Sequence, residues 1–208
     1  MFGLLRIRWA IAPKIAPRPI INCNRCGTLK AYQCSGKYRV NANGKRIDAW
    51  LIYRCIDCDN SWNLGILERC NRRDIEPALL AALESNDPAL ARRHAFDVVA
   101  LRSRIGRVEE FPDVAIRKEA LDDRQEKTTA LEIQLELEMP TSLRLDRLLA
   151  AELGISRSRL QAWEDRRLLV VAPDGTKALR RPVREGTAIR IDLAGESDRD
   201  AIVSAAGG

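Results

Sequence analysis

The sequence has one histidine, His94, among 208 residues, and it has no glycine-rich loop of the kind that binds phosphates. One histidine excludes a histidine-rich metal site, and its place in a predicted helix beside Arg92 and Arg93 favours a surface or packing role. No run approaches the ~18 apolar residues of a membrane-spanning helix. These absences argue against a histidine-based catalytic triad and against a membrane-spanning protein.

The first twenty residues superficially resemble an export signal, but Arg6 and Arg8 interrupt the apolar run. An export signal needs a continuous apolar core after its charges. Apolar residues instead alternate with polar or small ones, which predicts a strand. We therefore expect a cytoplasmic protein, in which paired cysteines indicate metal more than disulfides. The alternating apolar residues are Leu5, Ile7, Trp9 and Ile11.

The net charge of +6 is unevenly distributed. Residues 1–76 carry +8, residues 77–140 carry −4, residues 141–193 carry +4, and the remaining tail carries −2. Two basic modules therefore flank an acidic connector. Basic patches favour polyanions because binding releases condensed counterions, although an arginine-rich solvated surface has the same composition.

The order of patterns predicts an α+β fold with four parts. We expect a zinc ribbon domain over residues 1–73, and a helical and acidic connector with one strand over residues 74–140. A small α+β domain should follow over residues 141–193, with a disordered tail over residues 194–208. Within these parts the periodicity predicts a hairpin of Lys37–Val40 with Arg46–Tyr53, a helix over Pro88–Ile105 and a strand over Ala130–Glu138.

Four cysteines form two CxxC pairs with 28 residues between them. A CxxC turn places both sulfurs on one side, and two such turns complete the tetrahedral site that Zn²⁺ accepts. Gly27 after the first pair permits the positive φ that a tight turn needs. Four thiolates predict a closed, structural zinc site; redox CxxC motifs and an iron–sulfur cluster remain alternatives. The predicted ligands are Cys23, Cys26, Cys55 and Cys58, whereas Cys34 and Cys70 are interpreted as small buried apolar residues.

The N-terminal part also has a family resemblance. It is similar to a bacterial family catalogued as domain of unknown function 1062, and that resemblance supports an intact ribbon but implies no activity. The matching residues are Cys23 and Cys26, Lys37-Tyr-Arg-Val-Asn-Ala-Asn-Gly44, Asp48-Ala-Trp-Leu-Ile-Tyr-Arg-Cys55, Cys58 and Trp62.

Residues 143–193 have the pattern of a small separate module. A leucine stripe predicts a short helix that Gly154 ends, and Ser156 can cap a second helix over residues 157–166. Strands are expected at Leu168–Val171 and Thr187–Leu193, with a turn at Pro173-Asp-Gly175 between them. The leucines of the stripe are Leu145, Leu148, Leu149 and Leu153.

This module resembles the S-four RNA-binding domain. The resemblance lies in Arg144-Leu-Asp-Arg-Leu-Leu149, Ile155-Ser-Arg-Ser-Arg-Leu160 and Val183-Arg-Glu-Gly-Thr-Ala-Ile189. Two departures are Arg166-Arg167, where the family usually has a glycine, and Val171-Ala-Pro-Asp-Gly175 in place of its Val-Asn-Gly hairpin. The resemblance implies RNA contacts from Arg144, Arg147, Ser156, Arg157 and Arg159, with Arg166 and Lys177 as weaker candidates.

The leading hypothesis is a non-catalytic RNA-binding protein, associated with structured RNA or the ribosome, with a structural zinc ion. The alternatives are a zinc-ribbon adaptor for protein or DNA in transcription and an RNA-modifying enzyme. The carboxylates of residues 109–138 are interpreted as a solvated acidic face, and Asp48 is the first residue to test for catalysis.

Overall fold

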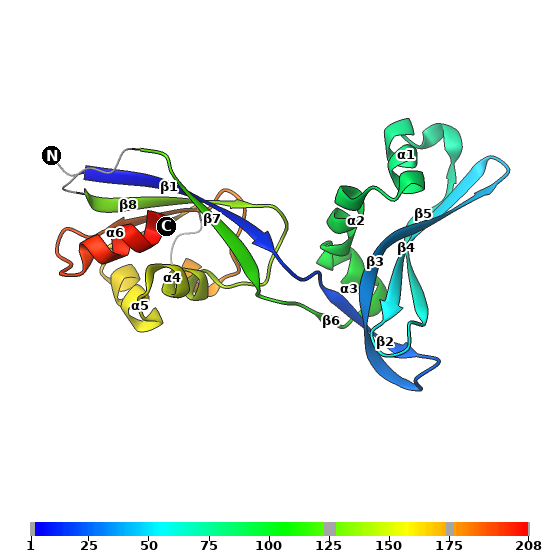
Figure 1. The fold of residues 1–208 in the computed structure, drawn as a ribbon, viewed down its shortest axis with the longest axis horizontal. Coiled ribbons are helices and arrows are strands. Elements are labelled where there is room, and N and C mark those ends of the chain that lie inside the picture. Colours follow the sequence, from blue (N-terminus) through cyan, green and yellow to red (C-terminus); the bar gives the residue numbers. More distant parts are fainter. Residues whose placement is uncertain (1–2, 123–127, 174–176, 208) are drawn as a thin grey trace. The chain divides into compact units, whose positions relative to one another are not determined.

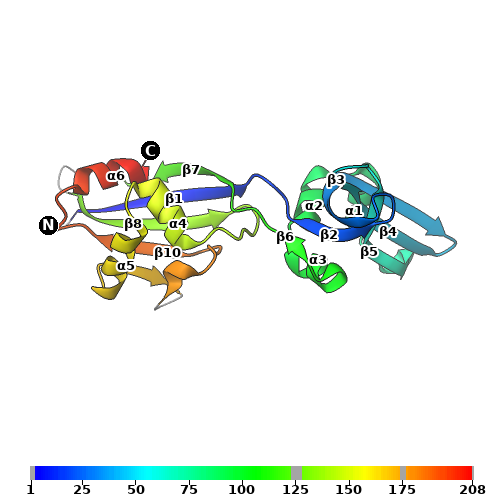
Figure 2. The same cartoon turned by 90° about the horizontal axis from the view of Figure 1, so that it is seen from below.

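The computed structural model describes residues 3–122, 128–173 and 177–207 (Figures 1 and 2). The predicted α+β class is confirmed, because both sheets and helices are present. The chain divides into two compact units. Unit 1 combines Met1–Lys14 with Pro112–Gly208, and unit 2 is Ile15–Phe111. None of the described helices is long and apolar enough to span a membrane.

Unit 1 contains a five-stranded sheet in the order β7-β1-β8-β10-β9. The N-terminal strand lies inside this sheet, antiparallel to β7 and parallel to β8, with Ile7 beside Ile133 and Trp9 beside Leu135. The strands are β1 (Gly3–Pro13), β7 (Val114–Ala120), β8 (Thr128–Leu137), β9 (Leu169–Ala172) and β10 (Ala188–Asp192).

Helices of the C-terminal region pack against one face of this sheet. Alternate β1 residues, among them Ile7 and Trp9, are fully buried there, as strand periodicity requires. The Trp9 indole nitrogen donates a hydrogen bond of 2.9 Å to the carbonyl of Ala206 in the last helix, so the two ends of the chain share one core. The helices are α4 (Leu145–Leu153), α5 (Arg157–Asp165) and α6 (Arg199–Gly207), with a 3-10 turn, η2 (Ala178–Arg180).

Two predicted parts differ from the structure at the chain ends. The first 14 residues were predicted to lie in the ribbon domain 1–73 but belong to unit 1, because β1 pairs with β7 and β8 and buries its apolar face in the unit 1 core. The predicted disordered tail is also corrected, since α6 buries Ile202, Val203 and Ala206 in the unit 1 core. Its small residues suit close helix–sheet packing. The predicted turn at residues 173–175 lies largely outside the described residues.

Unit 2 contains a second five-stranded sheet, in the order β5-β4-β3-β2-β6. The predicted hairpin is part of it, and its strands are longer than the sequence pattern indicated. The strands are β2 (Arg18–Cys23), β3 (Thr28–Asn43), β4 (Arg46–Cys55), β5 (Ser61–Asn71) and β6 (Val108–Glu109).

Three short helices follow β5 and pack against β2 and β3 on one side of the sheet (Figure 1). The single helix predicted over 88–105 is divided, because Asp97 caps a new helix by accepting a hydrogen bond of 2.9 Å from the amide of Ala100. The helical elements are η1 (Arg72–Asp74), α1 (Pro77–Ser85), α2 (Pro88–Ala95) and α3 (Val98–Ile105).

Candidate functional site

The two CxxC pairs form matched turns at one end of the unit 2 sheet. The first turn joins β2 to β3 and the second joins β4 to β5. In each turn the residue after the second cysteine donates its amide to the carbonyl of the first cysteine, over 2.8 Å for Gly27 and 3.0 Å for Asp59. Both residues have positive φ, +71° for Gly27 and +64° for Asp59. The glycine supplies that conformation without strain, whereas aspartate tolerates it at a small cost.

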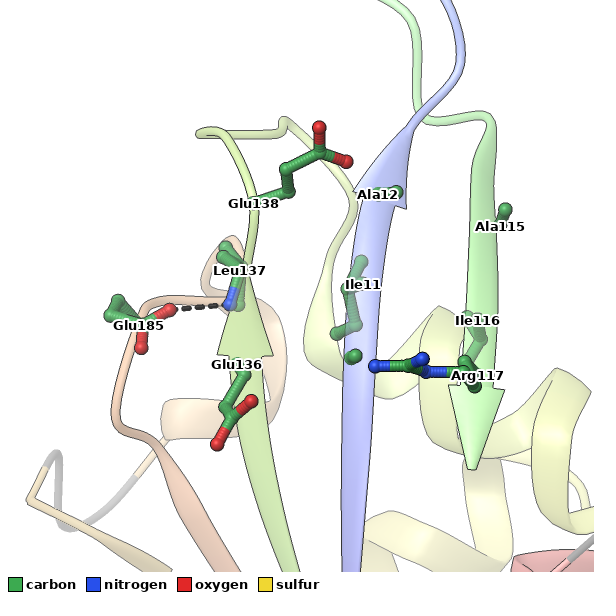
Figure 3. A pocket seen from close by; sticks show the side chains of 10 residues that line it. Ile11, Ala12, Ala115, Ile116, Arg117, Glu136, Leu137, Glu138 and Glu185 are labelled. Atoms are coloured by element: carbon green, nitrogen blue, oxygen red, sulfur yellow. Dashed lines mark hydrogen bonds between the residues drawn. The ribbon is translucent and has the colours of Figure 1, made fainter. Parts of the chain in front are cut away.

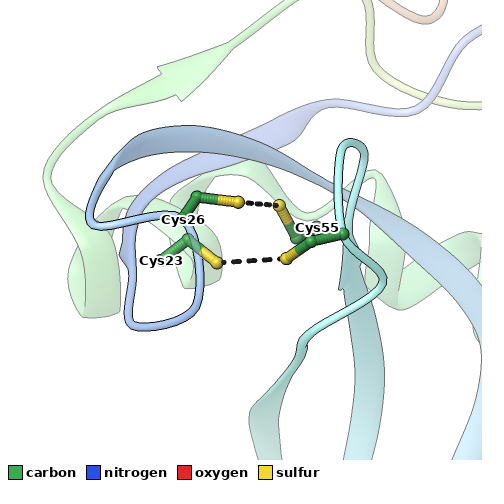
Figure 4. A group of neighbouring side chains, drawn as sticks. Cys23, Cys26 and Cys55 are labelled. Atoms are coloured by element: carbon green, nitrogen blue, oxygen red, sulfur yellow. Dashed lines mark hydrogen bonds between the residues drawn. The ribbon is translucent and has the colours of Figure 1, made fainter.

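Pairing of β3 with β4 brings the two turns together. Tyr32 on β3 lies opposite Cys55, so the turn that precedes β3 faces the turn that follows β4. The sulfurs of Cys23 and Cys58 are 3.5 Å apart, and those of Cys26 and Cys55 are 4.0 Å apart (Figure 4). All four sulfurs lie within 4.8 Å of one another, so the four predicted ligands form one group that could hold a metal ion.

The surroundings of the sulfurs differ between the buried and the open side. Cys23 and Cys55 are buried, whereas Cys26 and Cys58 are half-buried. The Asn60 amide nitrogen lies 3.8 Å from the Cys23 sulfur and 3.4 Å from the Tyr32 hydroxyl. These groups can orient the Cys23 sulfur and donate to its thiolate.

Hydrogen bonds within the cysteine group give its thiols different pKa values. A hydrogen bond from the Tyr32 hydroxyl lowers the pKa of Cys23 to about 6. Hydrogen bonding with Cys58, together with burial, raises the pKa of Cys26 to about 12. The cluster therefore retains protons at neutral pH without an ion, and a divalent cation must displace them to recruit all four thiolates.

The other two cysteines lie outside this group. Cys34 is half-buried at the edge of the unit 2 core, its sulfur accepts a hydrogen bond of 3.4 Å from the Gly36 amide, and burial raises its pKa. Cys70 is also half-buried and donates to the carbonyl of Glu68 over 3.7 Å. Neither side chain is fully buried, which differs from the prediction, although both contact apolar neighbours.

In unit 1 the structure brings two of the predicted RNA-contacting arginines to one carboxylate. Arg144 donates to Asp146 through Nε over 3.1 Å and Nη2 over 2.7 Å. Arg157 donates to the same carboxylate through Nε over 2.9 Å, and its Nη2 lies 2.8 Å away. The Asp146 side chain is 8% exposed, whereas those of Arg144 and Arg157 are 35% and 52% exposed. One buried carboxylate thus holds two partly exposed guanidinium groups.

Arg159 has a different environment from the one the sequence suggested. Its guanidinium donates to Asp198 and Glu196, which precede α6, and stacks on Trp163 at 4.8 Å. Its pKa is raised by these two carboxylates. Arg159 therefore connects the C-terminal segment to α5, and its charge is neutralised within the protein.

The remaining predicted residues lie at helix ends and turns. Ser156 caps α5 by accepting a hydrogen bond of 3.2 Å from the Arg159 amide. Arg147 lies one turn after Arg144 on α4, and Arg147 is exposed, as are Arg166 and Lys177. Lys177 precedes η2, a segment that reaches α4 through the hydrogen bond of 3.0 Å from the Leu145 amide to the Arg181 carbonyl.

Sequence reasoning missed three acidic residues that organise this surface. Asp146 is the centre of the arginine pair, and Glu196 and Asp198 hold Arg159. A usable signal existed for Asp146, because it lies beside the leucine stripe of α4 and between two arginines in sequence. No local signal pointed to Glu196 and Asp198, since their partner lies 37 and 39 residues away.

A hollow of about 560 Å³ lies on the helix-free face of the unit 1 sheet (Figure 3). Its floor includes Ala10, with Arg117 beside it on β7 and Glu136 beside it on β8. The hollow exists because the small side chain of Ala10 fills little of the space between Arg117 and Glu136. Two residues earlier on β1, the longer side chain of Arg8 reaches Glu136 and forms an ion pair of 2.9 Å. None of the described lining residues is a cysteine, histidine or serine, so they offer no nucleophile of these types.

Comparison with known proteins gives one family. The model of the family described as "Protein of unknown function (DUF1062)" matches residues 40–174, which include Cys55 and Cys58 and extend through α4 and α5. No curated protein and no solved structure matches the chain. The family match covers more than half of the sequence and confirms the resemblance seen in the N-terminal motifs. This chain therefore belongs to the DUF1062 family.

Proposed function

We propose that this protein is a non-catalytic, cytoplasmic RNA-binding protein with a structural Zn²⁺ ion. The four cysteines offer four soft thiolates and leave no position for a substrate, which is the donor set of closed zinc sites. A tetrahedron with Zn–S bonds of ~2.3 Å has S···S edges of ~3.8 Å. The observed 3.5 Å and 4.0 Å separations lie on either side of that value. Elemental analysis of the native protein should find zinc, and iron would contradict this assignment.

The observation that carries RNA binding is the pair of arginines held by Asp146. A free arginine loses side-chain entropy when it binds phosphate, whereas Arg144 and Arg157 are already oriented by the carboxylate. The bonds to Asp146 use Nε and Nη2 of each arginine, so Nη1 of both remains available to a phosphate oxygen. Two guanidinium charges against one carboxylate leave a net positive site.

The surrounding surface has the same charge. Arg147 is exposed one turn along α4, and the segment Lys177–Arg181 lies beside the start of this helix. The order of α4, α5, β9 and β10 agrees with an S-four-like module, as does the positive φ of +60° at Arg167, where that family usually has glycine. Structured RNA is recognised largely through shape and phosphates, which suits a rigid basic surface.

The test is a salt titration of binding to a structured RNA hairpin by the wild-type full-length protein and by Arg147→Gln. Arg147 is exposed and makes no ion pair with a described residue, so its replacement should leave folding intact. Loss of one phosphate contact should reduce the slope of log K against log salt by about 0.7 to 0.9. Asp146→Asn should weaken binding as well, because the arginine pair loses its fixed position.

The matched control is Arg190→Gln. Arg190 is exposed on β10, with its side chain on the helix-free face of the same sheet, so the substitution removes the same charge away from α4. It should change neither affinity nor slope. Equal losses of RNA affinity in Arg147→Gln and Arg190→Gln would show that binding depends only on the overall basic charge, and would contradict the proposal.

A further inference from the structure

The outward side of strands β3, β4 and β5 is a second surface with the chemistry of nucleic-acid binding. We call it the hairpin face. The opposite side of these strands carries Tyr38, Leu51 and Tyr53, which are buried in one apolar cluster with the helix residues Leu83 and Leu90. Strand periodicity places the intervening residues on the hairpin face. They are Arg39, Asn41 and Asn43 on β3, Arg46, Asp48 and Trp50 on β4, and Asn71 on β5.

Trp50 is the unusual residue of the hairpin face. It is half-buried and belongs to none of the three apolar clusters of the described residues. Arg39 lies directly opposite it on β3, and Gly65 lies opposite it on β5. Gly65 has no side chain of its own, and the Glu68 carboxyl group occupies the space above it on that side. The part of the indole that stays exposed, beside the Arg39 guanidinium, offers a π-surface on which a nucleobase can stack.

Cations gather at the far end of the same strands. The Arg72 amide donates to the Lys45 carbonyl over 2.9 Å, so the end of β5 lies beside the β3–β4 turn. Five exposed cations there, and Arg39 beside Trp50, make no ion pair with any residue in the described part of the chain. The five are Lys45, Arg46, Arg69, Arg72 and Arg73.

Two of the neighbouring carboxylates are already engaged, in contrast to these cations. Asp48 accepts a hydrogen bond of 2.7 Å from the Arg69 amide, and Glu68 pairs with Arg104 at 2.8 Å. The structure therefore leaves the positive charge of this surface largely uncompensated within unit 2. Such a surface gains free energy by releasing counterions when it binds a polyanion.

The spacing fits an extended strand of nucleic acid. Trp50 and Arg46 are four residues apart on β4, which corresponds to ~13 Å at ~3.3 Å per residue. A stacked strand advances ~3.4 Å along its axis per phosphate, so the face can contact several phosphates. The amides of Asn41 and Asn43 lie between the indole and the basic end and can both donate to and accept from a ribose 2′-hydroxyl.

We propose that the hairpin face binds single-stranded RNA, with a base stacked on Trp50 and phosphates held by Arg39, Arg46 and the neighbouring cations. This inference deepens the proposed RNA-binding function by adding a site in unit 2 that is separate from the arginine pair of unit 1. Binding at both sites would join a structured RNA to an adjoining unpaired segment.

The experiment uses the full-length, metal-loaded protein and a labelled oligouridylate of ~12 nucleotides, a length within the range that single-strand-binding folds cover. Trp50→Leu keeps an apolar side chain on the strand but removes the aromatic surface, and it should weaken binding by about 5- to 100-fold. Trp50→Phe keeps a stacking surface and should retain most of the affinity. Arg39→Gln should reduce the salt slope by about 0.7.

The outcomes separate this site from the arginine pair. Arg147→Gln should leave oligouridylate binding unchanged while weakening binding of the structured hairpin. Oligouridylate binding that is absent, or equal in Trp50→Leu and wild type, would overturn the hairpin-face proposal without affecting the unit 1 proposal. Tighter binding of oligodeoxythymidylate of the same length would overturn the assignment to RNA. Binding of a protein partner through Trp50, with no affinity for oligouridylate or oligodeoxythymidylate, would overturn nucleic-acid binding at the hairpin face.

Discussion

Replacement of Cys55 by serine should destabilise unit 2 and leave unit 1 folded. Cys55 is 2% exposed and lies at the end of β4, where it meets the turn that contains Cys26. Serine cannot supply a thiolate, so the ion would lose one ligand and the two turns would lose their link. Unit 1 shares no cysteine with this cluster and has its own core.

The magnitude follows from the loop that the proposed zinc ion would close. A cross-link between Cys26 and Cys55 encloses about 30 residues, and the chain-entropy model assigns such a loop ~3.6 kcal/mol. Unit 2 also has an apolar core that includes Leu51, Tyr53 and Leu83, so it should become weaker without unfolding completely at room temperature. A loss near 4 kcal/mol corresponds to a fall in Tm of about 15 to 30 °C for a domain of this size.

Differential scanning calorimetry with hydrogen-exchange mass spectrometry measures this prediction. We expect a lower unfolding transition and faster amide exchange in β2 through β5, with unchanged protection in β1 and β8. Cys34→Ser is the matched control, because it makes the same chemical change at a half-buried cysteine outside the cluster. Equal shifts in Cys55→Ser and Cys34→Ser, or no shift on metal removal with a chelator, would refute the reasoning.

Three further predictions concern Ile202 in α6, Asp198 just before that helix, and the protons of the four-cysteine group. Ile202→Ala should cost about 2–5 kcal/mol of the free energy of unfolding, because Ile202 is 2% exposed, whereas Ala201→Ser on the exposed side should cost little; denaturant titration distinguishes them. The hydrogen bond from Arg159 lowers the pKa of Asp198 in the folded protein. The stability that this ion pair contributes is therefore present above about pH 3.9, the pKa of an unfolded aspartate, and is lost as the pH falls through the lower pKa of the folded state. Asp198→Asn should lower stability at neutral pH and flatten the acid limb of a stability–pH profile. Zinc uptake must displace the proton of the Cys26 thiol, because the pKa of this thiol is raised to about 12. The apparent zinc affinity should therefore rise by about tenfold per pH unit for each displaced proton. Zinc uptake that is independent of pH would contradict this coupling.

Local sequence signals were sufficient wherever the structure depends on neighbouring residues. The alternation in β1 and β8, the leucine stripe of α4 and its end at Gly154 all appear in the structure close to their predicted positions. The four cysteines also belong to this class, because CxxC spacing and the positive φ of Gly27 are local properties. Their grouping then required only one hairpin between them.

Other features depended on partners that lie far away along the chain. Alternation shows that β1 buries one face, but it does not show that the partner is β8, which lies more than a hundred residues later. The tail after Leu193 has a composition that suggests disorder, yet its small residues pack as α6 against Trp9. Burial of that helix stabilises it more than composition alone would indicate.

The sequence by itself determined the four-cysteine group and most of the strands and helices, because those follow from local spacing and periodicity. Only the tertiary structure decided which charges remain available to a partner. It neutralises Arg159 with Glu196 and Asp198, holds Arg144 and Arg157 at Asp146, and places Trp50, half-buried, on the outer face of the unit 2 sheet. The physical reason is that an ion pair or an exposed ring depends on which distant side chains share its surface, and one-dimensional spacing does not contain that information.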